Sequence, residues 1–338
     1  MFKGEGFSQL QERKSEVNSH LWGIILAGGE GNRLQSYVEK IYGYPRPKQY
    51  CVLTGTRSLL EHTFDRALKV YSPEQLILLA NRSHTPFVCE ERFQKIQNVI
   101  YQPCGRETTA GILLPILKIY HQDPDAIISI FPSDQFIEQE SLFMHYIEDS
   151  NKFVSDNPEA IVMLGVRVKQ PESGCGWIEP SEALQFKPGR TILRVKKFWE
   201  KPESKLLQML CSQGCLCNTF VLTGKASSFI YSIKKLTPDV FEKFEVIYRN
   251  FGTPFESLVI QNVFPNIPMR NFSHEVLEKI TDQLYVLEVK GVNWSDWGEE
   301  ERVKRDIDRL KKKQTINVAA FKNKTIKNRI ESTNRIYA

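Results

Sequence analysis

Two basic residues lie close to a glycine-rich segment near the start of the chain. Three glycines in the range 28–31 follow the apolar run Leu21–Ala27, and Arg33 and Lys48 come after them. Glycine lets the backbone turn sharply and leaves no Cβ in the way of a ligand. Successive backbone N–H groups in such a turn can face one anion, and Arg and Lys both suit phosphate oxygens. The segment therefore predicts a site for a polyphosphate.

Three other interpretations of these glycines have to be weighed. The dinucleotide fingerprint needs a third glycine at the place where this run has Leu34. The Walker A loop needs Gly-Lys-Ser or Gly-Lys-Thr, and neither triplet follows here. The third alternative is a plain turn with solvated charges, because an isolated glycine motif is a weak signal.

A carboxylate ends another apolar run of the first half. Asp134 follows the run 125–131 in the segment Phe-Pro-Ser-Asp-Gln. An Asp at the carboxyl end of a strand, beside a polyphosphate site, is well placed to hold Mg2+, a hard cation that takes oxygen ligands. An Asp that merely opens a turn is the alternative.

The pattern of apolar runs predicts the elements that position these residues. Expected strands are 21–27, 76–80, 98–101, 125–131 and 160–166, and expected helices are 59–70, 85–97, 108–121 and 142–154. The strands are continuously apolar, which is typical of a mostly parallel sheet covered on both faces by helices. Ligands of such sheets lie outside the carboxyl ends of the strands. The glycine turn and the segments after Tyr101 and Phe131 all fall at such ends.

The second half of the chain is more mixed. Strands are expected at 174–179 and 192–199, joined by a turn at 188–189, and helices at 203–211, 225–234, 238–250 and 299–313. This half is interpreted as an elaboration that closes over the ligand. We therefore expect a polar extension at 1–20, one domain at 21–313 with halves 21–167 and 168–313, and a basic tail at 314–338 without an assigned role.

Composition narrows the class of protein. The chain has 338 residues, 41% hydrophobic and 25% charged, with a net charge of +5. These values are ordinary for a globular domain, and so small a charge gives no reason to expect nucleic acid. The first 20 residues are polar and no apolar run is long enough for a membrane span, so we expect a cytoplasmic protein without a membrane partner.

The cysteines point to the same compartment. Seven cysteines form no regular framework, so reduced thiols are the simpler interpretation. Cys211, Cys215 and Cys217 lie close together, with Cys175 upstream, which leaves zinc as an alternative. That alternative lacks any paired Cys-x-x-Cys spacing.

The glycine segment and its continuation resemble the signature of sugar-1-phosphate nucleotidyltransferases, especially mannose-1-phosphate guanylyltransferases. Those begin with Leu-Ala-Gly-Gly-x-Gly-Thr-Arg-Leu and continue to Pro-Lys-Gln-Phe, and here Asn32 replaces the Thr and Tyr50 the Phe. The resemblance implies an α/β fold with a Rossmann-like, mostly parallel mixed sheet and a sugar-binding second half. It also implies nucleotide contacts from Leu26, Ala27, Gly28, Gly29 and Gly31, with Arg33 and Lys48 as the catalytic cations.

A second motif follows the expected strand 98–101. The family has Glu-Pro-x-x-Arg-Asn-Thr-Ala-Pro here, and Pro103, Arg106 and Thr108 match it, while Glu107 stands in place of Asn. The resemblance implies that the three matching residues bind the nucleotide. Thr108 or Thr109 is expected to cap the following helix, whose N-terminus favours an anion. An ordinary capped helix is the alternative.

Motifs of the second half resemble the sugar-binding part of the family. Segment 174–179 resembles Gly-Tyr-Gly-Tyr-Ile, 198–202 matches Phe-x-Glu-Lys-Pro, and 217–220 lies where the family has Trp-Asn-Ser-Gly. The residues that the resemblance assigns to the sugar phosphate are Gly176, Glu200, Lys201 and Asn218. A surface ion pair before a helix is the alternative for Glu200 and Lys201.

Segment 293–298 resembles the family's Trp-Ser-Asp-Val-Gly and supplies a second carboxylate, Asp296. The resemblance implies Mg2+ on Asp134 and Asp296. It implies a reaction in which an NTP and a sugar 1-phosphate give an NDP-sugar and pyrophosphate. GTP and mannose 1-phosphate, giving GDP-mannose, are the first choice. The sugar phosphate is already a charged nucleophile, so this transfer needs alignment and charge neutralisation but no general base.

Two alternative functions stay open. One is a nucleotidyltransferase for another pair of base and hexose, giving an ADP-, UDP- or dTDP-hexose. The other is a catalytically weak regulatory protein that binds a sugar nucleotide, which is motivated by departures from the family pattern at Glu107, Gln135 and Cys217. Retention of the two cations and two carboxylates argues against it. The sequence does not decide between a monomer and a homodimer.

Overall fold

The computed structural model describes residues 19–89, 97–168, 170–187 and 189–312. Most of the expected extension 1–20, the tail 314–338, Pro188 of the expected turn and much of the expected helix 85–97 lie outside the described residues. Within the described part of the chain, every helix is too short or too polar to span a bilayer.

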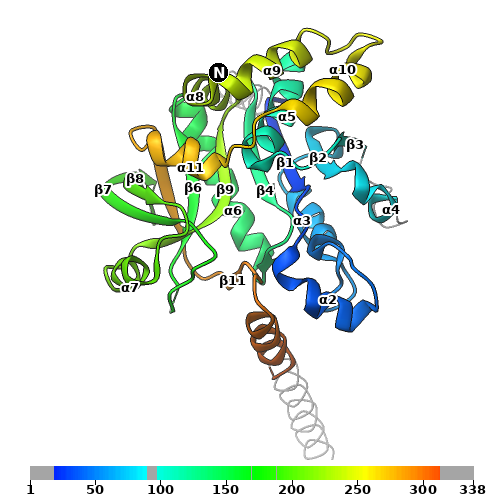
Figure 1. Ribbon diagram of the computed structural model, residues 1–338. Coiled ribbons are helices and arrows are strands. Elements are labelled where there is room, and N and C mark those ends of the chain that lie inside the picture. Colours follow the sequence, from blue (N-terminus) through cyan, green and yellow to red (C-terminus); the bar gives the residue numbers. More distant parts are fainter. Residues whose placement is uncertain (1–18, 90–96, 169, 188, 313–338) are drawn as a thin grey trace, which may run out of the picture.

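Nine strands of the described residues form one sheet in the order β3-β2-β1-β4-β9-β6-β10-β8-β7 (Figure 1). The strands are β1 (Leu21–Ala27), β2 (Leu76–Asn81), β3 (Asn98–Gln102), β4 (Ile127–Pro132), β6 (Ile161–Val166), β7 (Trp177–Lys187), β8 (Arg190–Trp199), β9 (Leu216–Lys225) and β10 (Leu284–Val289). A small second sheet pairs β5 (Phe136–Ile137) with β11 (Trp294–Ser295). Because both halves of the chain contribute to the large sheet, the second half extends the fold of the first.

The direction of the strands changes between the two halves. β1 runs parallel to β2 and β4, and β2 parallel to β3. β9 lies antiparallel between β4 and β6, and β10 is parallel to β6 but antiparallel to β8. The prediction of an α/β fold with a mixed sheet is confirmed. The prediction emphasised parallel strands. In the structure, parallel pairing is found among β1, β2, β3 and β4 and between β6 and β10.

Helices cover both faces of the sheet. One face packs against α3 (Leu59–Ala67) and α6 (Glu140–Asp156), and the other against α5 (Glu107–Gln122), α8 (Ala226–Leu236) and α9 (Pro238–Tyr248). The remaining helices are α2 (Gln35–Tyr42), α4 (Thr85–Val88), α7 (Ser204–Ser212), α10 (Glu256–Val263) and α11 (Phe272–Glu275). Neighbouring residues of β1 enter opposite cores, Ile24 on one face and Ile25 on the other. This burial on both faces explains the continuously apolar strands.

Two local predictions need correction. The expected threonine cap of α5 is wrong, because the helix begins at Glu107 after Arg106, whose side chain makes no capping hydrogen bond. Thr108 and Thr109 therefore lie inside the first turn. Shorter strands are expected between the helices of the second half, but no bounds are predicted for β9, since the polar pair Asn218 and Thr219 interrupts its apolar pattern near the start.

The last described segment, residues 300–312, is a helix that packs beside α2 and the small sheet (Figure 1). Trp297 stacks on Phe136 with ring centroids 4.6 Å apart. The Trp297 indole N–H also donates to Asp306 Oδ2 at 2.9 Å. Val303 is buried in one hydrophobic cluster with Trp297 and Phe136. These contacts attach the helix to the edge of the sheet where the predicted site lies.

Candidate active site

The glycine turn after β1 is fixed through its carbonyl groups. The Gln49 amide donates to Ala27 O at 2.9 Å and to Gly29 O at 2.7 Å, and the Asn81 amide donates to Gly28 O at 2.7 Å. Gly31 has φ +68°, and a Cβ there would lie 2.9 Å from the backbone nitrogen of Lys48. A side chain at this position would be both strained and blocked. The turn therefore depends on glycine to let Lys48 approach.

The ends of β1, β3 and β4 meet beneath the turn. A Cβ on Gly28 would lie 2.9 Å from the side-chain nitrogen of Gln102, which closes β3. Leu26 O accepts hydrogen bonds from the Ser133 backbone N–H at 3.2 Å and from the Ser133 hydroxyl at 2.7 Å. The predicted site thus lies at the carboxyl ends of parallel strands, as the rule for such sheets requires.

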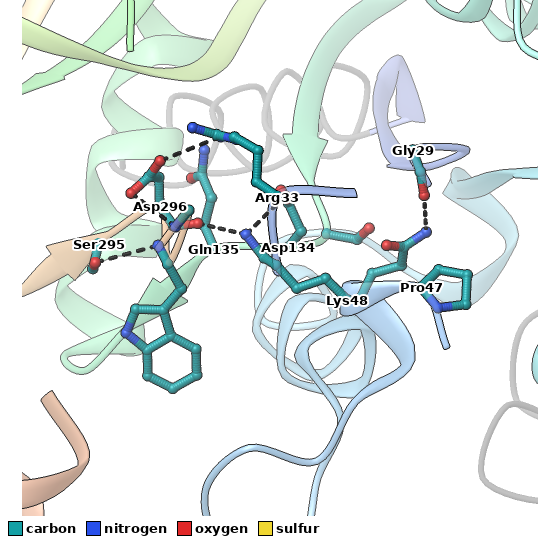
Figure 2. Close-up of polar contacts among 12 residues, drawn as sticks. Gly29, Arg33, Pro47, Lys48, Asp134, Gln135, Ser295 and Asp296 are labelled. Atoms are coloured by element: carbon teal, nitrogen blue, oxygen red, sulfur yellow. Dashed lines mark hydrogen bonds and ion pairs between the residues drawn. The ribbon is translucent and has the colours of Figure 1, made fainter. Parts of the chain in front are cut away.

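Lys48 joins the two sequence-predicted carboxylate residues (Figure 2). Its ammonium lies 3.0 Å from Asp134 Oδ2 and donates to the backbone oxygen of Asp296 at 2.5 Å. The Lys48 side chain is 4% exposed, whereas that of Asp134 is 45% exposed. Two motifs far apart in the sequence therefore meet at one buried cation, with a carboxylate beside it open to solvent.

Arg33 lies on the other side of Asp296 (Figure 2). Arg33 Nη2 is 3.6 Å from Asp296 Oδ2. A Cβ on Gly174 would lie 2.5 Å from Arg33 Nη1, and one on Gly298 would lie 2.5 Å from Asp296 Oδ2. The guanidinium and the carboxylate are therefore packed between two glycines, one from each flanking segment. Both glycines belong to motifs noted in the sequence.

Two further residues of this group were missed by the sequence analysis. Arg302 Nη1 donates to Asp296 Oδ1 at 2.5 Å and also forms an ion pair with Glu172. Burial raises the pKa of the Glu172 carboxyl, and the Arg302 guanidinium opposes that rise. Arg302 stands in a helix of mixed charge that gives no local sign of a buried arginine. Glu172 precedes the Gly174 motif without belonging to it.

The carboxylates fit the expected magnesium ion. Among the described residues no hydrogen-bond donor reaches Asp296 Oδ2, although that atom is buried. Asp134 offers a second, more open carboxylate, which pairs with Lys48, the residue that also contacts the Asp296 backbone oxygen. No group of three or more His, Cys, Asp or Glu side chains within the described residues could hold an ion. Mg2+ usually takes one or two carboxylates and completes its shell with water and substrate phosphates, which agrees with this donor set.

The predicted sugar residues lie together on the other half. A Cβ on Gly176 would lie 3.1 Å from Glu200 Oε2 and 2.5 Å from the Phe198 ring. The Asn218 N–H donates to Gly176 O at 2.8 Å, which joins β9 to the segment leading into β7. Lys201 Nζ lies 3.5 Å from Glu200 Oε1. The structure thus brings Gly176, Glu200, Lys201 and Asn218 into one neighbourhood.

Two of the predicted nucleotide-binding residues after β3 form hydrogen bonds with the segment around α11. The Arg106 guanidinium donates to Pro265 O, and the Thr108 hydroxyl accepts the Phe272 N–H at 2.7 Å. Both contacts tie the start of α5 to the segment around α11. Pro103 lies in the turn between β3 and α5. These three predicted residues therefore border the carboxyl end of β3, and the contacts found for Arg106 and Thr108 are with this neighbouring segment.

The fold and this site define an α/β protein with a glycine turn, a buried lysine and two acidic residues gathered at one edge of the sheet. Residues 22–302 match the family described as Nucleotidyl transferase, and the chain belongs to that family.

Curated relatives narrow the comparison. The chain is 28% identical over 286 residues to mannose-1-phosphate guanylyltransferase 2 of Escherichia coli O157:H7, covering 81% of this chain and 57% of the relative. It is 26% identical over 280 residues to the alginate biosynthesis protein AlgA of Pseudomonas fluorescens, covering 81% and 56%. The chain thus spans little more than half the length of these relatives.

A solved structure supports the fold. It is described as mannose-1-phosphate geranyltransferase from Thermus thermophilus, and it superposes with a TM-score of 0.70 at 20% identity. The match covers 82% of this chain and 76% of that one.

Proposed function

We propose that the protein transfers a nucleotidyl group from an NTP to a hexose 1-phosphate, giving an NDP-sugar and pyrophosphate. The observation that carries this proposal is that the ammonium of Lys48 contacts both the Asp134 carboxylate and the backbone oxygen of Asp296, beside the glycine turn. A buried cation next to two acidic residues and a glycine turn suits phosphoryl transfer. The names of the curated relatives support GTP and mannose 1-phosphate as the substrates and GDP-mannose as the product.

The reaction joins two anions, so charge is the main obstacle. A phosphate oxygen of the sugar 1-phosphate attacks the α-phosphorus of the NTP, and the bond from that phosphorus to the bridging oxygen breaks. Pyrophosphate leaves with the electron pair. Arg33 and Lys48 stabilise the charge that develops on the α-phosphate and on the leaving group, because fixed cations act strongly where water is excluded. Lys48 is held in place before the substrate arrives.

Asp134 and Asp296 would hold Mg2+, which supplies additional charge neutralisation when bound. Substrate phosphates would complete its coordination. The turn residues Leu26, Ala27, Gly28, Gly29 and Gly31 would bind the triphosphate, and Pro103, Arg106 and Thr108 would line the side toward the base.

The second half would bind the other substrate. The Glu200 carboxylate, close to Gly176, would accept hydrogen bonds from sugar hydroxyls, and Lys201 would meet the sugar phosphate. Asn218 would complete the neighbourhood, although its side-chain oxygen already accepts the Phe220 N–H at 3.0 Å. That leaves the N–H groups of the Asn218 side-chain amide to donate to a sugar oxygen.

The test is a panel assay of pyrophosphate release. GTP, ATP, UTP and dTTP would each be combined with mannose, glucose and galactose 1-phosphates in the presence of Mg2+. We expect the highest kcat/KM for GTP with mannose 1-phosphate. Preference for another pair would correct the specificity and keep the reaction. No turnover with any pair, together with tight binding of a sugar nucleotide, would contradict the proposal in favour of a binding protein.

A further inference from the structure

Arg302 contacts three carboxylates from a nearly buried position. Its Nη1 donates to Asp296 Oδ1 at 2.5 Å and pairs with Glu172, and its Nη2 lies 3.2 Å from Glu299 Oε1. The side chain is 10% exposed. A planar guanidinium can bind several carboxylate oxygens in fixed directions, which an ammonium cannot do. Arg302 is therefore placed to determine the orientation of the Asp296 carboxylate.

The orientation matters because the two oxygens of Asp296 have different surroundings. Oδ1 is taken by Arg302 and accepts the Gly298 N–H at 3.2 Å. Oδ2 is buried, receives no hydrogen bond from the described residues, and lies 3.6 Å from Arg33 Nη2. The arrangement thus keeps one oxygen of the carboxylate occupied and leaves the other available beside Arg33.

Without Arg302, the nearest remaining guanidinium is that of Arg33. An Asp296 carboxylate released from Arg302 is expected to rotate toward Arg33 and form a closer pair, since a buried carboxylate seeks a cation. That pair would occupy Oδ2 and would also withdraw Arg33 from the substrate. One substitution would then disturb two functional groups without replacing either of them.

We propose that Arg302 is a positioning residue that holds Asp296 Oδ1, so that Oδ2 stays available to the metal and phosphates and Arg33 stays available to the substrate. The inference rests on the proposed function. It gives the helix of residues 300–312 a role in the site. The helix can carry that role because Trp297 and Val303 anchor its start in a buried cluster.

The first measurement concerns metal binding and needs no turnover. Equilibrium dialysis would measure Mn2+ binding in the presence of inorganic pyrophosphate, since carboxylate and phosphate oxygens suit Mn2+ as they suit Mg2+. We expect Arg302→Met to weaken Mn2+ binding about 10-fold or more, the usual effect of losing a partner of a metal ligand. Arg302→Lys keeps the charge and should recover part of the loss. Arg302→Gln tests the same loss of charge if the Met variant does not fold.

Two matched controls separate positioning from folding. Arg309→Met lies in the same helix and removes an ion pair with Glu138, away from Asp296. Glu172→Gln removes the charge of a second partner of Arg302 but keeps the contact with Asp296. Both variants are expected to bind Mn2+ within about threefold of the wild type, even if their melting temperatures fall, because the oxygen that faces the metal is undisturbed.

The second measurement is steady-state kinetics with the best substrate pair of the panel. Arg302→Met should lower kcat about 10- to 100-fold and leave the KM of the sugar phosphate nearly unchanged. Mn2+ binding and kcat equal to those of Arg309→Met would overturn the inference while the proposed function stands. Failure of the wild type to bind Mn2+ with pyrophosphate would also overturn it. Absence of turnover with normal Mn2+ binding would instead contradict the proposed function.

Discussion

The two halves of the site hold their charged groups in different ways. In the first half, Lys48 is buried, pairs with Asp134 and donates to the backbone oxygen of Asp296. In the second half, the Lys201 side chain is 56% exposed and lies 3.5 Å from Glu200. A buried, fixed cation is suited to stabilise charge during the reaction, whereas an exposed one is free to adjust to a substrate. We infer that the first half serves the chemical step and the second half serves selection.

Strained backbone occurs in both halves. The glycine turn of the first half has a glycine, Gly31, at its positive φ. Residues other than glycine also have a positive φ, among them Glu107 of the first half (+60°), and Lys201 (+44°) and Phe220 (+58°) of the second. Such residues cost free energy and persist where the surroundings enforce them, often at ligand sites. The predictions below test the contrast between the charged groups of the two halves, from the largest expected effect to the smallest.

Replacing the buried cation should have the largest effect. We expect Lys48→Met to lower kcat about 1000-fold, because a fixed, desolvated charge is worth most in the transition state. The matched variant Lys201→Met should mainly raise the KM of the sugar phosphate. Steady-state pyrophosphate release measures both variants, and circular dichroism checks that they fold. Equal losses of kcat in the two variants would break the distinction between the halves.

Arg33 is a more exposed cation of the first half, with a side chain 57% exposed. We expect Arg33→Ala to lower kcat about 100-fold, as loss of one charge-stabilising donor typically does. The free energy of unfolding should barely change, since exposed ion pairs contribute little. Urea denaturation and steady-state kinetics on one preparation measure the two quantities. A wild-type kcat would remove Arg33 from the mechanism.

Glu200 tests the assignment of the second half. Glu200→Gln should raise the KM of the sugar phosphate about 10-fold, because hydrogen bonds to a charged acceptor weaken when the acceptor becomes neutral. The dissociation constant of the NTP should stay unchanged. Glu179→Gln, which removes an ion pair with Lys196 in the same half, is the control. Equal weakening of both substrates by Glu200→Gln would contradict the assignment to the sugar.

Glu107 is a strained residue of the first half and should give the smallest effect. Its φ is +60° at the start of α5. Glu107→Gly should raise the free energy of unfolding by about 1 kcal/mol relative to Glu107→Ala, because only glycine adopts this conformation without steric cost. Urea denaturation of the two variants measures the difference. Equal stabilities would show that the surroundings of Glu107 compensate its strain.

The sequence predicted the position of the glycine turn well because its signals are local, and its binding of an anion stays a prediction. Strand β1 begins and ends at the predicted residues, and Lys48 lies against Gly31 as the spacing of cations and glycines suggested. Asp134 and Asp296 could be proposed as partners only through the family resemblance. The residues around Asp134 and Asp296 in the sequence do not indicate that both aspartates contact Lys48.

The placement of β9 and the burial of Arg302 could not be predicted from local sequence patterns. The insertion of β9 antiparallel between β4 and β6 is a long-range choice that the order of apolar runs does not determine. Arg302 belongs to a predicted charged helix, and a helical pattern of charges does not show which arginine is buried. Its contact with Asp296 depends on the packing of Trp297 and Val303, which the fold alone decides.

The most direct test of the central claim compares Asp134→Asn, Asp296→Asn and the double variant over a range of Mg2+ concentrations. Asn keeps the shape and removes the charge of each ligand. If both carboxylates serve one metal site at Lys48, each single variant should lose most of its activity and need more Mg2+. The double variant should be little worse than the worse single one, because residues that act as a unit are not additive. Multiplicative losses, or turnover undiminished by EDTA, would contradict the account.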